Sequence, residues 1–591
     1  MTVPTEDDIL LEVADLCVDF KGDDGYRNVV DHVCYTLRRG RTLGIVGESG
    51  SGKSVSSMAI MGLLPPNGRV SGGSALFHGH KVGQFYSNVS PLASDERPTP
   101  VDLVRLSQKE MRSYRGNRIS MVFQEPMTSL NPVQRCGAQV MEMLRLHEKV
   151  SRKEAKARVI ELFEEVLLPR PEKIFNSYPH EISGGQKQRV MIAMALVCNP
   201  DLVIADEPTT ALDVTVQKTI LELLRHLQQS RHLGIIFISH DLGVIGQIAD
   251  EVAVMYKGRI VEQGPVDQIL HHPRHPYTRG LLACRPPAEG HPLRLPTVSE
   301  FLENEGLETA DAQVPGPEAE VGNGSAPRTP LLKVTDLEVT YTLKKNLLGR
   351  PTQQLRAVDR VSFEVYKGET LGLVGESGCG KTTIGRSLLR LIDSSSGSIE
   401  YQGMRLDRMS QPQMRALRPK LQIVFQDPYS SLNPRLTIGE AILEPLRVYG
   451  GSRFRTSVSS RKQVLRLMEQ VGLEPEWYSR YPHEFSGGQR QRVCIARALI
   501  LNPELVVCDE SVSALDVSVQ AQVLNLLNDL KRQYGYTYIF ISHDLGVVRF
   551  LSDRIMVMRQ GRIVETGPAD EVYAHPREEY TQHLISSIPK I

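Results

Sequence analysis

The segment Gly47–Ser54, with the sequence GESGSGKS, returns in the second half of the chain as Gly375–Thr382, with the sequence GESGCGKT. Each copy follows a short apolar run, Thr42–Val46 in the first and Thr370–Val374 in the second, and each precedes a helical pattern. The pattern G-x-x-x-x-G-K-[ST] between a strand and a helix is typical of a phosphate-binding loop. Two such loops in matching contexts predict a chain that contains two copies of one nucleotide-binding unit.

Each loop supplies the groups that hold the phosphates of a nucleotide. Its glycines let successive backbone N–H groups curl around phosphate oxygens, and the start of the next helix adds positive potential. The lysine reaches the outer phosphates, and the hydroxyl of Ser54 or Thr382 can bind Mg²⁺. The predicted nucleotide-binding residues of the loops are Gly47, Glu48, Ser49, Gly50, Ser51, Gly52, Lys53, Ser54, Gly375, Glu376, Ser377, Gly378, Cys379, Gly380, Lys381 and Thr382.

Composition narrows the class of protein. The chain has 591 residues, 41% of them hydrophobic and 23% charged, which is enough for about two to four globular domains. Lys plus Arg and Asp plus Glu both number 69, so no net basic field argues for nucleic acid. The eight cysteines are scattered singly, which predicts a reducing compartment and neither a disulfide framework nor a zinc site. We see no signal peptide and no apolar run long enough to span a membrane, so a role at a membrane requires separate membrane subunits.

The repeat sets the predicted domain boundaries. Residues 1–285 and 331–591 form the two units, and residues 286–330, rich in Pro, Gly, Glu and Ala, form a flexible acidic linker. An ordered extra domain between the units would need apolar periodicity, which this stretch lacks. The first unit carries extra residues at about 81–106, whose prolines and serines predict a surface excursion.

Within each unit the pattern is α/β. In the first unit, strand-like runs at 202–205 and 234–239 bracket a helical segment near 214–229, and the second unit repeats this order. Strands that alternate with helices imply a largely parallel sheet, whose ligands bind at the carboxyl ends of the strands.

Catalytic side chains are predicted at those strand ends. An apolar strand ends in Asp-Glu, where the aspartate can hold the magnesium shell and the glutamate can polarise the attacking water. A later strand ends in Ile-Ser-His-Asp, where the imidazole can contact the terminal phosphate and the water, although a histidine at a strand end is often only a solvated residue. These residues are Asp206, Glu207 and His240 in the first unit and Asp509, Glu510 and His543 in the second.

A second helix start in each unit also carries the features of an anion site. The segments Ile182–Gln186 and Phe485–Gln489 read ISGGQ and FSGGQ, and Ser-Gly-Gly presents a hydroxyl and bare backbone N–H groups to an anion. The residues predicted to bind nucleotide here are Ser183, Gly184, Gly185, Gln186, Ser486, Gly487, Gly488 and Gln489.

On these motifs the chain resembles the ATP-binding cassette (ABC) proteins, whose signature is LSGGQ. The resemblance covers about residues 11–282 and 332–585. It implies an ATPase that uses ATP and Mg²⁺, with an α/β fold of two tandem ABC nucleotide-binding domains. Each domain is expected to have a RecA-like parallel-sheet core, an antiparallel β subdomain and a helical signature subdomain. Two cassettes of this family sandwich two ATP molecules head to tail, so one site would join Lys53 to Ser486 and the other Lys381 to Ser183.

The resemblance assigns further positions. It implies an aromatic residue stacked on adenine, a glutamine that binds the metal and senses both the γ-phosphate and the transporter, and a loop that holds the cassettes together. These are Phe20 and Tyr341, Gln124 and Gln426, and residues 211–213 and 514–516. After its Asp-Glu pair the first cassette has Pro208-Thr209, the commoner form in the family, whereas the second cassette has Ser511-Val512. Both carboxylates of the second cassette are intact.

Narrower segments resemble the ATPases of oligopeptide and dipeptide importers. They are Gln124–Pro132, Gln426–Pro434, Tyr178–Glu181, Tyr481–Glu484 and His275–Thr278. This resemblance implies the ATP-hydrolysing subunit of a bacterial importer for peptides or related small solutes, with both cassettes fused in one chain. Its expected partners are two transmembrane permease subunits and an extracytoplasmic solute-binding protein, and its expected place is the cytoplasmic face of the inner membrane, as a peripheral subunit.

Two expectations limit this interpretation. Cys284 stands alone where related ATPases often carry a cysteine cluster, so we expect no iron–sulfur cluster. The alternative function is a soluble tandem-cassette ATPase that acts on ribosomes or nucleic acid. The acidic linker and the lack of metal-binding insertions argue against it, so we expect no nucleic-acid partner.

Overall fold

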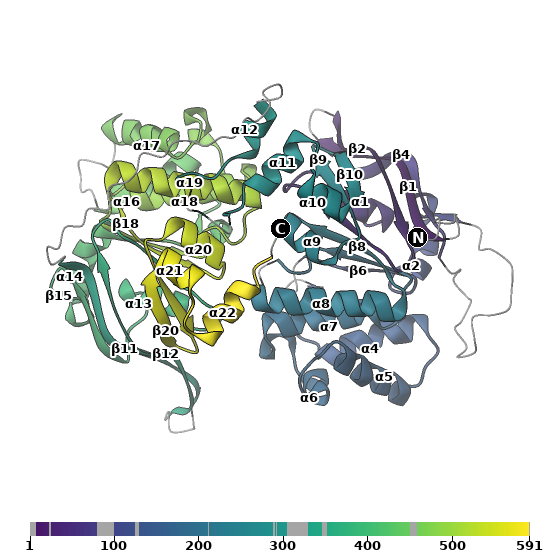
Figure 1. Ribbon diagram of the computed structural model, residues 1–591, viewed down its shortest axis with the longest axis horizontal. Helices are drawn as coiled ribbons and strands as arrows, with labels where there is room; N and C mark the ends of the chain where they lie inside the picture. The colour runs from purple at the N-terminus through teal and green to yellow at the C-terminus, as the bar shows by residue number, and fades with distance from the viewer. Residues whose placement is uncertain are drawn as a thin grey trace.

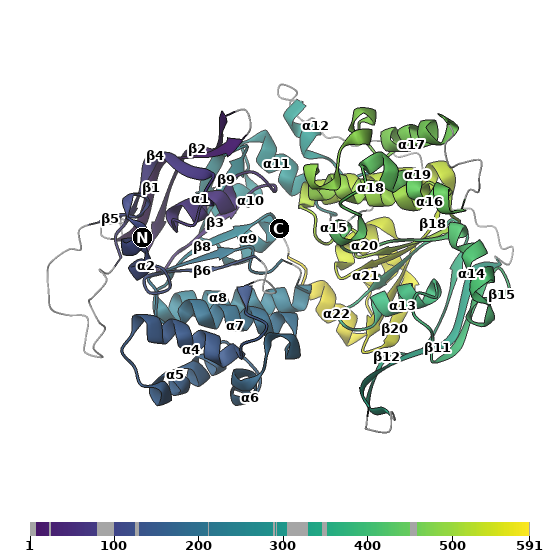
Figure 2. The same cartoon turned by 180° about the vertical axis from the view of Figure 1, so that it is seen from behind.

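The computed structural model describes residues 8–22, 25–79, 100–124, 129–210, 212–287, 290, 292–303, 329–345, 351–449 and 458–589. Two α/β units lie side by side, the first drawn in purple to teal and the second in green to yellow (Figures 1 and 2). Each unit combines a six-stranded sheet, a four-stranded antiparallel sheet and a group of helices. The predicted α/β class is confirmed, and we call the units the first and second cassette.

The six-stranded sheets carry the phosphate loops. Their strand orders are β10-β9-β3-β8-β7-β6 and β16-β17-β18-β13-β19-β20, and only the pairs β9–β10 and β19–β20 are antiparallel. The central strands are buried along their whole length, as expected where helices or a second sheet cover both faces. The strands are β3 Thr42–Val46, β6 Ile119–Val122, β7 Leu202–Asp206, β8 Gly234–Ser239, β9 Glu251–Tyr256, β10 Arg259–Pro265, β13 Thr370–Val374, β16 Leu421–Val424, β17 Leu505–Asp509, β18 Thr537–Ser542, β19 Arg554–Arg559 and β20 Arg562–Pro568.

The antiparallel sheets have the orders β2-β1-β4-β5 and β12-β11-β14-β15. In each cassette a separate apolar core joins this sheet to the first helix after the phosphate loop and to the six-stranded sheet. The strands are β1 Ile9–Gly22, β2 Gly25–Arg38, β4 Gly68–Phe77, β5 Val101–Asp102, β11 Pro330–Lys345, β12 Pro351–Tyr366, β14 Ser396–Tyr401 and β15 Met404–Arg405.

The helices of each cassette fall into two groups, one on the six-stranded sheet and one in a helical subdomain beside it (Figure 1). In the first cassette they are α1 Lys53–Ile60, α2 Gln108–Tyr114, α4 Cys136–His147, α5 Arg152–Glu165, α6 Pro171–Asn176, α7 Gly184–Leu196, α8 Val214–Arg231, α9 Leu242–Ile248, α10 Val266–His271, α11 Pro276–Ala283 and α12 Val298–Glu303. In the second they are α13 Lys381–Leu388, α14 Gln411–Leu417, α15 Pro428–Ser431, α16 Ile438–Tyr449, α17 Val458–Gln470, α18 Gly487–Leu499, α19 Val517–Tyr534, α20 Leu545–Leu551, α21 Ala569–Ala574 and α22 Glu579–Ser586.

The insert of the first cassette is shorter than the sequence suggested. Residues 101–105 form β5 and a 3-10 turn, and residues 404–408 form the matching β15 and 3-10 turn in the second cassette. This segment therefore belongs to the shared fold, because β5 pairs with β4 just as β15 pairs with β14. Residues 80–99, which hold most of the predicted excursion, lie outside the described residues.

The first part of the predicted linker differs from the expectation of a flexible tether. Leu295 is 1% exposed and Val298 is 5% exposed, and α12 packs against α11. The Asn525 side chain on α19 donates to the backbone oxygen of Leu295 over 2.8 Å and accepts from its N–H over 2.9 Å. The segment 292–303, which we call the docking segment, therefore contacts both α11 of the first cassette and α19 of the second, and residues 304–328 lie outside the described residues.

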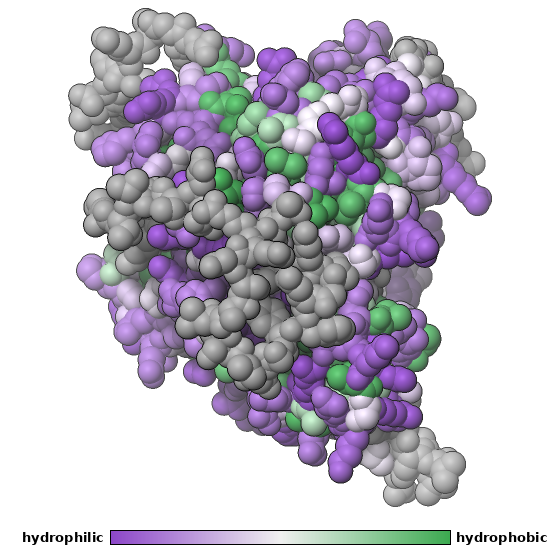
Figure 3. All heavy atoms as spheres, turned by 90° about the vertical axis from the view of Figure 1, so that its right-hand side faces the viewer, coloured by the Kyte–Doolittle hydropathy of each residue, from purple (hydrophilic) through white to green (hydrophobic). Residues whose placement is uncertain are grey.

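The surface mixes polar and apolar residues. On the face that the first cassette turns away from the second, hydrophobic residues occur in small groups among hydrophilic ones (Figure 3). Among the described residues, no helix is both long enough and apolar enough to cross a membrane.

Candidate functional site

The phosphate loops follow β3 and β13 and end at the first turns of α1 and α13. Gly52 and Gly380, directly before these helices, have φ of 100° and 111°, a backbone conformation that glycine adopts without strain. A Cβ at Gly380 would lie 2.3 Å from the backbone oxygen of Ala357, so no side chain fits there. Lys53 donates to the backbone oxygens of Gly47 and Glu48 over 2.6 and 2.8 Å, which folds the loop around its ammonium group.

The same arrangement holds in the second loop. Lys381 donates to the backbone oxygens of Gly375 and Glu376 over 2.6 and 2.9 Å. Both lysines are almost fully buried, with 4% and 3% exposure. A buried cation whose hydrogen bonds to oxygen go to backbone oxygens is well placed for an anionic ligand, because the phosphates of a nucleotide would offset its desolvation.

The predicted metal-binding groups meet beside each loop. Ser54 donates to Asp206 over 2.9 Å, and Thr382 donates to Asp509 over 2.8 Å. Burial raises the pKa of Asp206 to about 6 and also raises the pKa of Asp509. A hydroxyl beside a buried carboxylate is a hard oxygen set that suits Mg²⁺, and a cation there would remove the unfavourable burial of the negative charge.

The predicted catalytic residues also lie together. Glu207 accepts from Gln124 Nε2 over 3.0 Å, and its Oε2 lies 3.3 Å from His240 Nδ1. Burial alone would raise the pKa of Glu207, but the hydrogen bond and charge of His240 outweigh it and lower this pKa to about 2. Burial would lower the pKa of His240, and Glu207 outweighs that effect and raises it. Each group thus favours the charged form of the other, and Glu207 stays a carboxylate that can orient and polarise a water molecule.

The second cassette repeats this cluster with a longer distance between the glutamate and the histidine. Glu510 accepts from Gln426 over 2.8 Å, and its Oε2 lies 3.8 Å from His543 Nδ1. Its other oxygen lies 3.8 Å from Lys381 Nζ. Burial would raise the pKa of Glu510, but His543 outweighs burial and lowers it.

One local contact differs between the clusters. Thr210 donates to the Glu207 carboxylate over 2.8 Å, whereas Ser513, at the matching position, donates to the backbone oxygen of Glu510 over 2.9 Å. The Glu207 carboxylate therefore has one hydrogen-bond donor more than its counterpart.

The two signature segments begin α7 and α18. Ser183 and Ser486 are exposed and cap these helices, each accepting from a glutamine N–H over 3.4 Å. The second glycine of each signature has a packing reason, since a Cβ at Gly185 would lie 2.6 Å from Val216 on α8. The same Cβ at Gly488 would lie 2.1 Å from Val519 on α19, so only glycine lets these helices pack this closely.

Each phosphate loop contacts the opposite cassette. Ser49 N–H donates to Asp516 over 2.8 Å, and Ser377 N–H donates to Asp213 over 2.6 Å. These aspartates end the segments 211–213 and 514–516, which the resemblance assigned to holding the cassettes together; Ala211 itself lies outside the described residues.

A second pair of contacts lies beside the first. Thr215, two residues after Asp213, donates to Glu376 over 2.9 Å. Ser518 in the same position of the second cassette donates to Glu48. The cassettes therefore face each other head to tail, and a cavity of about 110 Å³ between them is lined by both His240 and His543.

Some predicted residues are not joined to these clusters. Among the described residues, neither Ser183 nor Ser486 forms a hydrogen bond to the opposite phosphate loop. Phe20 is half-buried on β1 and Tyr341 is 38% exposed on β11, so both side chains are partly accessible on the antiparallel sheets. Residues 125–128 of the segment Gln124–Pro132 lie outside the described residues.

Two residues that touch the phosphate loops were not among the predicted site residues. The hydroxyl of Tyr277 accepts from Glu48 N–H over 2.9 Å, and that of Tyr580 accepts from Glu376 N–H over 3.1 Å. Tyr277 is fully buried and lies in the His275–Thr278 segment, whose sequence resembles the peptide-importer ATPases. A repeated Tyr-Thr pair after each cassette was the available signal.

Comparison with known proteins agrees with this geometry. The ABC transporter family matches residues 30–210 and 358–513. The C-terminal region of oligopeptide/dipeptide transporters matches residues 261–305 and 564–591, so the docking segment belongs to a recognised part of the first cassette.

Relatives match almost the entire chain. It is 47% identical over 98% of its length to a glutathione import ATP-binding protein of Shigella dysenteriae, and 46% identical over 98% to that of Escherichia coli K12. Both alignments cover 89% of the relative. A solved dimeric ATP-binding cassette with ADP and phosphate aligns to 40% of this chain and 98% of its own, with 28% identity and a TM-score of 0.37. The chain belongs to the ABC transporter family, as an ATP-binding ATPase subunit that carries two cassettes of the oligopeptide and dipeptide transporter type.

Proposed function

We propose that this chain drives the import of short peptides, glutathione among them, by closing and opening its two cassettes at two composite ATP sites. The observation that supports it most is the identity of 47% over 98% of the chain with a glutathione import ATP-binding protein. The match to the oligopeptide/dipeptide transporter region after both cassettes points to the same class of solute. Neither comparison favours a tandem ATPase that acts on ribosomes or nucleic acid.

Each composite site would use residues of both cassettes. The first joins Lys53, Glu207 and His240 to the signature at Ser486, and the second joins the matching residues to the signature at Ser183. The hydrogen bonds of Asp213 and Asp516 to the opposite loops support this pairing, because they already place each loop against the other cassette. Closure would bring the exposed signature hydroxyls onto the phosphates.

Within a site we assign roles by geometry. Lys53 and the N–H groups of residues 47–54 bind the phosphates, and Ser54, Asp206 and Gln124 hold Mg²⁺. Bound Mg²⁺ neutralises phosphate charge. Glu207 orients the attacking water, and His240 fixes the Glu207 carboxylate and faces the terminal phosphate. Tyr277 acts as a positioning residue, because its hydroxyl accepts from the loop N–H of Glu48.

Motion at the sites must reach membrane subunits. In the second cassette a cavity of about 430 Å³ lies beside Gln426 and is lined by Leu391, Phe425 and Val448. Val448 is 50% exposed, and the first cassette exposes Leu146 to 70% at the matching place on α4. Exposed apolar residues around a groove next to a catalytic glutamine suit the docking of a helix from each of two permease subunits.

The partners would place the chain at the cytoplasmic face of the inner membrane, with an extracytoplasmic binding protein that supplies the solute. Solute choice then rests with the permeases and the binding protein, since the chain offers them only ATP-driven motion.

Reconstitution tests the function. The chain is combined in liposomes with its permease subunits and binding protein, and uptake of labelled glutathione and of di- to octapeptides is followed with ATP. Accumulation that is lost in Lys53→Ala plus Lys381→Ala supports the proposal. Uptake of a metal chelate or a sugar with no response to any peptide would refute it.

A further inference from the structure

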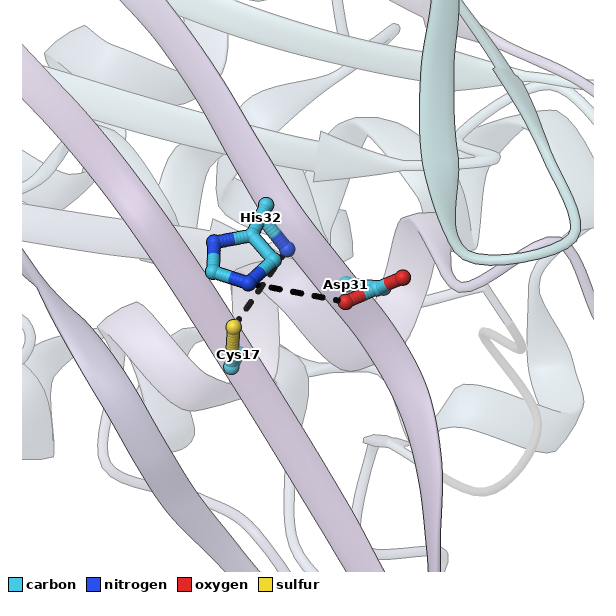
Figure 4. Close-up of side chains that lie close together, drawn as sticks. All are labelled: Cys17, Asp31 and His32. Carbon is cyan, nitrogen blue, oxygen red and sulfur yellow. Dashed lines mark hydrogen bonds and ion pairs between the residues drawn. The ribbon is translucent and has the colours of Figure 1, made fainter.

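A bulge in the antiparallel sheet of the first cassette brings three possible metal ligands together (Figure 4). Leu16 on β1 pairs with Val33 on β2, and Val18 pairs with Val30, so Cys17 faces two residues of β2, Asp31 and His32. His32 has φ of 49°, which lets the extra residue fit into the strand.

The ligand atoms converge. A sulfur of Cys17, a carboxylate oxygen of Asp31 and an imidazole nitrogen of His32 all lie within 4.8 Å of one another, and His32 Nε2 lies 4.0 Å from Asp31 Oδ1. Thiolate, imidazole and carboxylate are the ligand types that Zn²⁺ prefers. Ligands of a tetrahedral Zn²⁺ lie about 3.3–3.8 Å apart, so the cluster needs to close by about 1 Å. The His32 side chain is 69% exposed and has room to make that movement.

Neighbouring groups already orient these ligands as they would around a metal. Asp15 Oδ1 lies 3.5 Å from His32 Nδ1, and Nε2 is the nitrogen that faces Asp31. Arg259 pairs with Asp31 Oδ2 and leaves Oδ1 on the side of His32. The backbone N–H of His32 donates to Cys17 Sγ over 3.3 Å, which holds the sulfur at the bulge.

The second cassette provides an internal comparison, because it has the same bulge with different residues. Leu337 pairs with Val361 and Val339 pairs with Val358, so Glu338 and Arg360 take the places of Cys17 and His32. They form an ordinary ion pair with Nε and Oε1 3.1 Å apart.

The surrounding residues of the two bulges are matched. Asp359 and Arg562 repeat the pair of Asp31 and Arg259. Asp336 repeats Asp15, and Ser362 donates to it where the first cassette has Cys34. Only the first cassette therefore combines a thiol with an imidazole at this position.

We propose that Cys17, Asp31 and His32 bind one zinc-class divalent ion, with water at the open coordination position. The ion would join β1 to β2 in the first cassette only. Because β1 also carries Phe20, the bound ion would stiffen the strand that we assign to adenine stacking in one of the two ATP sites. The sequence predicted no zinc site, since these residues lie on two strands and show no recognisable ligand spacing.

A simpler interpretation is that Cys17 only accepts a hydrogen bond from the backbone N–H of the bulge and binds no metal. Substituting the residues of the second bulge into the first distinguishes this interpretation from the proposal. Cys17→Glu plus His32→Arg gives the first bulge the ion pair that the second bulge already holds, so this variant is expected to fold. Cys34→Ser is the matched control. It removes a nearby exposed thiol and introduces the serine that the second cassette has at the matching position, Ser362. Thermal melting of each full-length chain, without metal, checks that the fold is intact.

Zinc binding is measured on the nucleotide-free, chelator-treated full chain against a competing indicator, and Co²⁺ absorption reports thiolate ligation. We expect one tight equivalent in the wild type and in Cys34→Ser, and affinity weaker by more than about 100-fold in the exchange variant and in Cys17→Ser. We also expect a thiolate-to-cobalt charge-transfer band only in the first two proteins. Equal zinc affinity in the wild type and the exchange variant, no tight equivalent in the wild type, or a wild-type cobalt spectrum without that band would each overturn the proposal.

Discussion

The two cassettes share the main contacts of their phosphate loops and catalytic clusters but differ at the edges of the fold. In both, a lysine folds the loop, a hydroxyl donates to a buried aspartate, and a glutamine donates to a glutamate. At the β1–β2 bulge the first cassette has Cys17 and His32, where the second has an ion pair. The duplicated contacts are those that face nucleotide or the opposite cassette, and the free surfaces have diverged.

The docking segment shows the same asymmetry. Asn525 on α19 is 4% exposed and holds both backbone groups of Leu295. Glu222, at the matching position of α8, is exposed. The second cassette thus holds the segment that follows the first cassette, while Glu222 on the first cassette is exposed.

The largest expected effects come from the catalytic glutamates. Glu207→Gln and Glu510→Gln should each lower ATP turnover by about 100-fold, equivalent to roughly 2.7 kcal/mol of barrier, because each removes the carboxylate that orients water. Steady-state phosphate release measures this, and nucleotide binding should be retained. Nearly full activity in either variant would show that its site contributes little and that the cassettes are not equivalent in catalysis.

The next largest expected effect is on stability, and it comes from the two hydrogen bonds between Asn525 and the backbone of Leu295. Asn525→Ala leaves the buried N–H and C=O of Leu295 without partners, which should lower the free energy of unfolding by about 1–3 kcal/mol. Glu222→Ala is the matched control and should change it by less than about 0.5 kcal/mol. Denaturant unfolding of the full chain measures both, and equal effects would mean that the docking segment does not stabilise the second cassette.

A smaller difference is expected in the pH dependence of Mg²⁺ binding. Only the deprotonated carboxylate binds the ion, and burial raises the pKa of Asp206 to about 6. Magnesium-dependent ATP affinity at the first site should therefore fall about tenfold per pH unit below about pH 6. Lys381→Ala isolates this site, and a fluorescent ATP analogue reports its affinity.

The second site carries a charge that the first lacks. Arg386 Nε lies 4.0 Å from Asp509 Oδ2 and opposes the effect of burial on its pKa. Met58 occupies the matching position on α1 in the first cassette. Met58→Arg should therefore move the pH midpoint of the first site downward, and an unchanged or higher midpoint would contradict this electrostatic explanation.

The sequence was sufficient to predict the strands and loops that hold the phosphates. A phosphate loop needs glycines, a lysine and a hydroxyl at fixed spacing, and a buried parallel strand is a plain apolar run, so both leave local patterns. The strand 42–46 and the helix that begins at Lys53 lie as expected.

Contacts between distant segments left no comparable pattern. Tyr277 contacts Glu48 across most of the first cassette, and although the Tyr-Thr pair recurs at Tyr580, the repeat does not indicate which residue the hydroxyl contacts. Cys17 and His32 become neighbours only through a strand bulge, which sequence spacing does not reveal. Leu295 and Val298 form too short an apolar pattern to predict packing, so the docking segment was taken for part of a flexible linker.

Disulfide crosslinking tests whether the cassettes pair head to tail around two composite sites. Cys379 is first replaced by serine, the residue at the matching Ser51, and cysteines are then placed at Ser183 and Ser377 in one protein and at Ser183 and Ser49 in another. With ATP and a hydrolysis-deficient Glu207→Gln, Glu510→Gln background, the first pair should crosslink within the chain and the second should not. Crosslinking of Ser183→Cys to Ser49→Cys, with none to Ser377→Cys, would contradict the account.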